Sequence, residues 1–145
     1  MKKGSQNILA TITMAAAVTL GAIAGPASAA DLTVEINGSG DKGNVLVALY
    51  RAEDKWLGKP FAGSKALANK DGVKLVFKGL AAGEYALSLF VDENNNGKMD
   101  SNALGIPTEL FAFSNDAFGN FGPPKFDQAK FKVENDHKTI MVTFK

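Results

Sequence analysis

The chain has 145 residues, with 16 basic and 15 acidic side chains, one histidine and no cysteine. The near balance of charge, without a basic stripe, argues against nucleic acid as a partner, and the lack of cysteine excludes disulfides. Beyond the N-terminal region no run is long and apolar enough to span a bilayer. The length suits one domain with a modest core.

The first predicted element is a secretory signal peptide at residues 1–29. Lys2 and Lys3 precede an uncharged run of small and apolar residues at 8–24. Ala27-Ser28-Ala29 follows with the small-residue pattern of a cleavage site. This order of features predicts a bacterial protein that is exported to the periplasm or secreted.

A retained membrane anchor is the alternative, because the apolar run approaches the length of a short span. Its Ala, Gly and Thr content makes it weakly hydrophobic, so cleavage near Ala29 or Ala30 is favoured. The mature chain is then a single β-sandwich domain at 30–145. Losing Lys2 and Lys3 takes the 16 basic residues to 14 against 15 acidic ones, a net charge near −1.

Alternation of apolar and polar residues predicts about seven short strands and no long helix in the mature domain. Leu32, Val34 and Ile36 share one face, as expected of a strand with one side in a core. The run 44–50 is apolar on both faces and, with 85–91, is predicted as a central strand. The predicted fold is all-β: a seven-stranded antiparallel Greek-key sandwich, transthyretin-like or immunoglobulin-like, with one long Phe-rich loop. The strands are predicted at 32–36, 44–50, 64–68, 73–77, 85–91, 130–134 and 139–144.

Turn-forming residues separate these strands. The segment 69–72 is predicted to turn the chain from the third strand into the fourth, and 135–137 to connect the last two as a hairpin. A single helical turn is predicted at 53–57, and residues 114–116 are predicted to cap another.

Residues 92–100 read DENNNGKMD and match the first part of a calcium-binding loop. Calcium prefers several oxygen ligands, and loops of this kind supply them at alternating positions around a glycine that allows a sharp turn. Gly97 stands where that glycine is needed. The candidate ligands of a Ca²⁺ ion are the side chains of Asp92, Asn94, Asn96 and Asp100 and the backbone carbonyl of Lys98.

Two features separate this loop from a complete EF-hand. Ala103 stands where the hand needs a bidentate glutamate, and a strand rather than a helix leads into the loop. A distant carboxylate such as Glu109 could complete the cage. Because only Asp92 and Asp100 carry charge at ligand positions, weak binding of about 0.1 to 1 mM is expected. The alternative is a plain polar turn, since Asn and Asp tolerate left-handed backbone angles and bond their own backbone.

The second candidate site is a Phe-rich segment that follows the loop. Half of the ten phenylalanines lie within residues 111–126, interleaved with Gly and Pro that rule out a long helix. One interpretation is a long connection that buries its rings as a second core over an open end of the sandwich. The other is an exposed aromatic surface for an unknown protein, glycan or apolar ligand. The candidate contact residues are Phe111, Phe113, Phe118 and Phe121.

The sequence predicts that the protein is not an enzyme. The only histidine, His137, lies in a predicted turn, and without cysteine the thiol triads and the usual zinc ligands are missing. Asp92 and Asp100 as a glycosidase pair are the least supported alternative. Trp56, with Tyr50 nearby, is expected to pack against an apolar strand and not to stack on a sugar. The expected function is a non-catalytic module with weak calcium and partner binding, and the alternative is a structural or accessory module without metal.

Four segments carry a resemblance to a known family: GNVLVALY, FKGLAAGEYALSLFVDENNNGKMD, LGIPTELFAFSND and FGNFGPPKFDQAKF. In order and spacing they resemble the bacterial domain-of-unknown-function family 2141, which implies a small exported β-protein without an established activity. The chain departs from that pattern at Val91, where histidine is frequent, and at 110–113, where glycines are usual. The segment FKGLAAGEYALSLF also resembles transthyretin-like sandwiches, including carboxypeptidase regulatory domains, which implies a binding or structural part.

Overall fold

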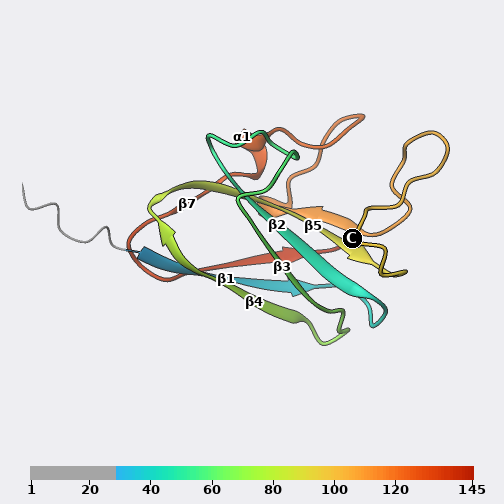
Figure 1. The fold of residues 1–145 in the computed structure, drawn as a ribbon, viewed down its shortest axis with the longest axis horizontal. Coiled ribbons are helices and arrows are strands. Elements are labelled where there is room, and N and C mark those ends of the chain that lie inside the picture. The colour runs from blue at the N-terminus through green and yellow to red at the C-terminus, as the bar shows by residue number, and fades with distance from the viewer. Residues whose placement is uncertain (1–28) are drawn as a thin grey trace, which may run out of the picture.

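The computed structural model describes residues 29–145 (Figure 1). The predicted signal peptide lies outside the described residues, apart from Ala29. Within the described part, no helix is long and apolar enough to cross a membrane. The chain from residue 29 onward forms two packed β-sheets of three and five strands, an open sandwich-like arrangement with little helix.

The three-stranded sheet has the order β4-β1-β8. β4 (Val73–Ala81) lies antiparallel to β1 (Ala29–Asn37), and β8 (Lys138–Thr143) lies parallel to β1. The parallel pair departs from the antiparallel prediction. β1 and β8 are far apart in the sequence, so no tight turn fixes their relative direction.

The five-stranded sheet has the order β3-β2-β5-β6, and β7 also pairs with β5. β5 is long enough for two short strands to pair along the same edge, β7 opposite residues 83–85 and β6 opposite residues 88–90. A 3-10 turn, η1 (Ser114–Asp116), and a short helix, α1 (Phe126–Ala129), lie between β6 and β7. The strands are β2 (Asn44–Arg51), β3 (Ala62–Leu67), β5 (Gly83–Asp92), β6 (Phe111–Phe113) and β7 (Phe131–Val133).

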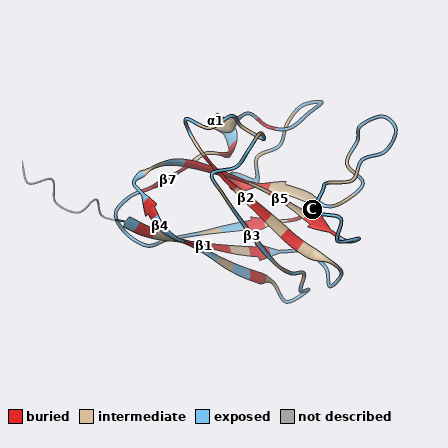
Figure 2. Ribbon diagram, viewed as in Figure 1, coloured by how far each residue is buried: buried red, intermediate tan, exposed pale blue. Residues whose placement is uncertain are grey.

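The main core lies between the two sheets, where the alternating apolar residues of both sheets meet (Figure 2). Leu32 and Val34 of β1 and Leu87 and Leu89 of β5 are all completely buried. Burying each such side chain contributes about 1.5 to 3 kcal/mol. The structure therefore confirms which faces of the predicted strands are buried, except that Leu75 and Ile140 are only half-buried. The strands concerned are those predicted at 32–36, 73–77, 85–91, 130–134 and 139–144.

Several predicted connections are corrected. The described residues form eight strands rather than seven, because β6 was not predicted. β7 and β8 belong to different sheets, so residues 135–137 cross between sheets and do not form a hairpin. The same holds for 69–72, which carries the chain from β3 to β4. Residues 53–57 form turns and no helix, and α1 appears where no helix was predicted.

Candidate functional site

The outer face of the five-stranded sheet carries two cross-strand rows of side chains. In the first row, Leu46 lies opposite Lys65 on one side and Phe90 on the other, and Phe90 lies opposite Phe111. The second row is built mainly from small residues: Gly63, Ala48, Ser88 and Phe113. Small side chains beside larger ones leave a depression in this face of the sheet.

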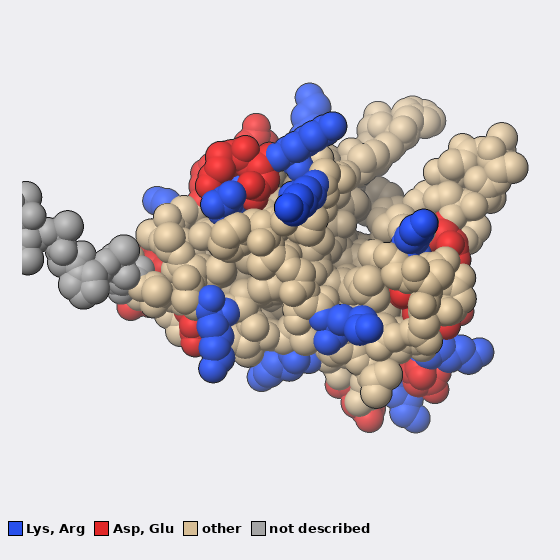
Figure 3. All heavy atoms as spheres, in the orientation of Figure 1, with Lys and Arg blue, Asp and Glu red and all other residues tan. Residues whose placement is uncertain are grey.

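Two projecting loops, which we call the arms, turn this depression into a groove. The first arm is residues 99–107, which follow β5, and the second, the Phe arm, is residues 117–124, which follow η1. The arms stand apart from the body of the molecule, with a hollow between them (Figure 3). Together with the sheet face they line a groove of about 1230 Å³, which is as large as the cavities that hold small organic ligands.

The arms expose apolar side chains to an unusual extent. Leu104 is 84% exposed, Phe118 73% and Phe121 fully exposed. The segments 101–108 and 117–124 contain no charged residue. Monomeric proteins rarely expose contiguous apolar surface of this kind without a partner or ligand for it.

The base of the Phe arm is held by a second, smaller core that contains Phe113 and Ala129. Trp56 packs edge-on against Phe126, with ring centroids 5.8 Å apart, and its Nε1 donates a hydrogen bond of 2.8 Å to the Pro124 carbonyl. The role of Trp56 is therefore packing, as the sequence favoured. A Cβ added to Gly119 would come within 1.7 Å of the Gly122 carbonyl oxygen, so the arm closes too tightly for any larger residue there.

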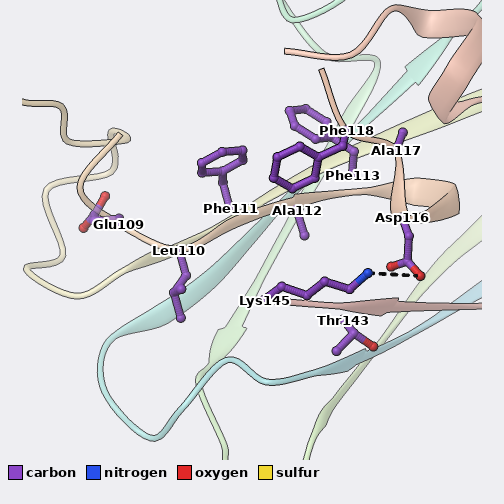
Figure 4. A pocket seen from close by; sticks show the side chains of 10 residues that line it. All are labelled: Glu109, Leu110, Phe111, Ala112, Phe113, Asp116, Ala117, Phe118, Thr143 and Lys145. Carbon is purple, nitrogen blue, oxygen red and sulfur yellow. Dashed lines mark ion pairs between the residues drawn. The ribbon is translucent and has the colours of Figure 1, made fainter. Parts of the chain in front are cut away.

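The predicted contact phenylalanines divide between the two interpretations of the segment. Phe113 is buried and Phe111 half-buried in the second core, whereas Phe118 and Phe121 are exposed. Figure 4 shows the rings of Phe111, Phe113 and Phe118 on one side of β6 and Ala112 on the other. The rings on the first side line the groove.

A small cavity of about 130 Å³ also lies beside β6, where Ala112, Thr143 and Lys145 contribute to its lining. Lys145 lies along it and forms an ion pair of 3.9 Å with Asp116, as the dashed line in Figure 4 marks. A cavity of this size is too small for the ligand sizes that the groove accommodates.

The turn between β2 and β3 contributes Leu57 and Pro60 to the lining of the groove. Its first residues are held by Asp54, whose carboxylate accepts hydrogen bonds from the Arg51 backbone N–H at 2.8 Å and from Arg51 Nη2 at 2.9 Å. The Arg51 guanidinium also stacks 4.4 Å above the Phe61 ring. Hydrogen bonding from Arg51 lowers the pKa of Asp54 and, in turn, raises the pKa of Arg51.

A pH-dependent stability difference is expected from this pair. Because the pKa of Asp54 is lower in the folded chain, its contribution is present above the unfolded pKa of about 3.9 and is lost as the pH falls through the folded value. Asp54→Asn is therefore expected to melt at a slightly lower temperature than the wild type at pH 7 and at the same temperature near pH 2. An undiminished difference at pH 2 would contradict the assignment, and calorimetry across this range measures it.

The acidic-amide loop, residues 92–100, is built from side-chain oxygens that accept backbone hydrogens. Asp92 is 2% exposed, and its carboxylate accepts hydrogen bonds from the backbone N–H of Asn96 at 3.1 Å and of Gly97 at 2.8 Å. Asn94 Oδ1 accepts from the same Asn96 N–H, and Asn96 Oδ1 accepts from the N–H of Lys98. Gly97 has φ +74, the left-handed conformation that the sharp turn requires.

The side chains of the loop converge on Asp100. Its carboxylate accepts a hydrogen bond of 2.7 Å from Asn96 Nδ2 and another from Asn94 Nδ2. Glu109 fastens the two ends, since its carboxylate accepts from the backbone N–H of Glu93 and of Asp100, each at 3.0 Å. The structure thus brings together the side chains of Asp92, Asn94, Asn96 and Asp100 and the predicted distant carboxylate. Lys98 joins them through its backbone N–H, which donates to Asn96 Oδ1.

This network is formed by hydrogen bonds among the loop residues and Glu109. Among the residues that the structure describes, no group of three or more His, Cys, Asp or Glu side chains is placed to hold a metal ion. A calcium ion bound at Asp100 would need the oxygens of Asn94 and Asn96 where their amide N–H groups now point. Turning the amides would break the hydrogen bonds that these oxygens accept from the backbone N–H groups of Asn96 and Lys98. His137 lies far along the chain in an exposed turn, with Nε2 3.1 Å from Thr33 Oγ1.

The sequence interpretation missed the first arm and the sheet face. Leu104 and Ile106 were not singled out, although the uncharged run LGIP around them was a usable signal. Leu46 and Phe90 were assigned to central strands, and only the register shows that they share an outward face with Lys65.

The architecture and the surface define a β-rich domain of two packed sheets that presents an apolar groove. The chain belongs to the family described as uncharacterized proteins conserved in bacteria (DUF2141), whose family model matches residues 34–141. The match extends from β1 to β8 and includes both arms and the acidic-amide loop, and it confirms the predicted resemblance. No curated protein and no solved structure matches the chain.

Proposed function

We propose that the protein is an exported, non-catalytic binding module that holds an apolar ligand in the groove between its arms. The observation that carries the proposal is the exposure of Leu104, Phe118 and Phe121 on opposite arms, above a sheet face lined by Leu46 and Phe90. Leaving such side chains in water is unfavourable by about 25 cal/mol per Å² of apolar surface. A ligand that covers them recovers this free energy.

Export rests on the signal-peptide pattern at the N-terminus, which predicts a periplasmic or extracellular place of action. The resemblance of the segment FKGLAAGEYALSLF to transthyretin-like sandwiches supports a binding role, because loops fixed to a rigid sandwich commonly carry binding residues. An accessory role without any ligand leaves the apolar arms unexplained. A glycan hydrolase is disfavoured because both oxygens of Asp92 accept backbone hydrogen bonds within its own loop.

The groove is tested with the uncharged fluorophore N-phenylnaphthylamine, which brightens in apolar surroundings. The wild type is expected to bind it saturably. Ser88→Phe places a ring on the small-residue floor and is expected to weaken binding about tenfold, the equivalent of about 1.4 kcal/mol. Val76→Phe, at a 44% exposed position on the three-stranded sheet, is the matched control and is expected to bind normally. Absence of saturable binding, or equal binding by Ser88→Phe, would contradict the proposal.

A second proposal concerns the acidic-amide loop, which we propose takes up one calcium ion weakly. Support comes from the convergence of Asp92, Asn94, Asn96 and Asp100 within one hydrogen-bonded network, with the Lys98 carbonyl as the fifth candidate ligand. Glu109 also binds both ends of the loop. The loop leads into the first arm, so an ion here stiffens one wall of the groove.

The expected calcium effect is small and measurable. With a dissociation constant of about 0.1 mM, 1 mM calcium adds roughly 1.4 kcal/mol to the free energy of unfolding. Melting the wild type in calcium and in chelator is expected to show this shift, and Asp100→Asn is expected to abolish it. If calcium does not change the melting temperature of the wild type, the calcium proposal is wrong and the loop is a polar turn.

A further inference from the structure

The groove has one charged residue among its lining residues, Lys65 of β3. Its side chain is exposed at the edge of the sheet, and it forms none of the ion pairs found among the described residues. No Asp or Glu lines the groove. The groove is thus apolar along its length with one unpaired cation at one end.

The direction of the groove follows from the sheet register. Lys65, Leu46, Phe90 and Phe111 lie opposite one another on four adjacent strands, so the row runs across the strands. Three steps between neighbouring strands, at about 4.8 Å each, give a length of about 14 Å. The two arms leave β5 and η1 at opposite ends of these strands and flank the row on both sides.

We infer that the ligand of this groove is a free fatty acid of about twelve carbons or more, with its carboxylate at Lys65 and its chain along Leu46, Phe90 and Phe111 between the arms. The inference rests on the proposed function and deepens it by naming the ligand class. An extended chain advances about 1.2 Å per bond, so about twelve bonds span the row. A chain of about twelve carbons or more therefore reaches Phe111 at the far end of the row.

The chemistry of the lining separates this ligand from other candidates. A glycan needs many hydrogen-bonding groups, whereas the polar side chains of the lining are Lys65, Tyr50 and the serines Ser64, Ser88 and Ser101. The Tyr50 hydroxyl already donates a hydrogen bond to the Gly58 carbonyl. A cationic amphiphile would place its charge beside Lys65 without a carboxylate to receive it. A chain with one negative end matches both the apolar row and its single cation.

The test is displacement of N-phenylnaphthylamine from the purified protein by dodecanoate below its micellar concentration, with dodecanol as the uncharged chain of equal length. The wild type is expected to bind dodecanoate more tightly than dodecanol. Because an exposed ion pair contributes about 0.2 to 1 kcal/mol, Lys65→Gln is expected to weaken dodecanoate about two- to fivefold and leave dodecanol unchanged. Lys70→Gln, an exposed lysine outside the groove, is the matched control and is expected to bind both like the wild type.

The outcomes separate this inference from the proposed function. Equal affinity for dodecanoate and dodecanol, or an equal loss in the Lys65 and Lys70 variants, overturns the fatty-acid assignment while probe binding still supports the groove. Cosedimentation with anionic phospholipid vesicles, without displacement by monomeric dodecanoate, also overturns it and assigns the arms to a membrane surface. Failure of the probe itself to bind overturns both.

Discussion

Gly43→Ala is expected to lower the free energy of unfolding by about 3 kcal/mol or more. Gly43 has φ +75, where a side chain costs about 1 to 2 kcal/mol, and a Cβ would lie 2.1 Å from the Asp92 carbonyl oxygen and 2.6 Å from Glu93 Cα. Both contacts are with backbone, so they cannot be relieved by rotating a side chain. Relief requires β2 and the end of β5 to separate, which adds about 1 to 3 kcal/mol.

The measurement is denaturant unfolding of Gly43→Ala beside a control glycine. Gly122→Ala is the control because nothing lies within 4 Å of the added Cβ and its φ is not in the left-handed region. The control is expected to change stability by less than about 0.5 kcal/mol. Since Gly43 holds the start of the acidic-amide loop in place, Gly43→Ala is also expected to weaken any calcium response. Equal stability of the two variants would contradict the close approach at Gly43.

Ser114→Ala is expected to destabilise the protein by about 2 to 3 kcal/mol. β6 and β7 pair with the same edge of β5 and leave a gap between them at Leu87. The Ser114 hydroxyl occupies this gap: its Oγ accepts a hydrogen bond of 2.9 Å from the Leu87 N–H and donates one of 2.5 Å to the Ala129 carbonyl. Alanine leaves both buried backbone groups without these partners, which is the cause of the loss.

The control for Ser114→Ala is Ser88→Ala on β5, the strand to which the Ser114 hydroxyl is hydrogen-bonded. Ser88 is half-buried on the outer face, whereas Ser114 is completely buried. We expect the control to change the unfolding free energy by less than about 0.5 kcal/mol. Because Ser114 links β5 to the segment after β6, its loss is also expected to raise hydrogen exchange in the Phe arm. If Ser114→Ala were as stable as Ser88→Ala, the Leu87 N–H and the Ala129 carbonyl would have other hydrogen-bond partners.

The strands and their buried faces were predictable because each depends on a local pattern of period two. The face of Leu32, Val34 and Ile36 is one example, and that of Leu87 and Leu89 is another. Pairing was not predictable in the same way. The turn at 135–137 has hairpin composition, yet β7 pairs with β5 and β8 with β1. The strand with which each C-terminal strand pairs depends on which sheet edge is unpaired in the folded sandwich, and a local sequence pattern does not give this.

β6 escaped prediction because it is only three residues long, and Phe111–Phe113 was interpreted as part of a loop. Its partner, β5, supplies the ladder that turns this segment into a strand. The groove escaped prediction for a related reason, since Lys65, Leu46 and Phe90 become neighbours only through strand register. The acidic-amide loop was located correctly from its spacing, because Asp92 and Gly97 interact within five residues of each other.

The most direct test of the central claim is amide NMR of the protein titrated with N-phenylnaphthylamine. The account predicts that the shifted resonances map to the groove floor around Gly63 and Ser88 and to the arms at 99–107 and 117–124. The amides of the three-stranded sheet are predicted to stay in place. Shifts that cluster on β1, β4 and β8, or a spectrum that the probe leaves unchanged, would contradict the claim that the two arms hold an apolar ligand.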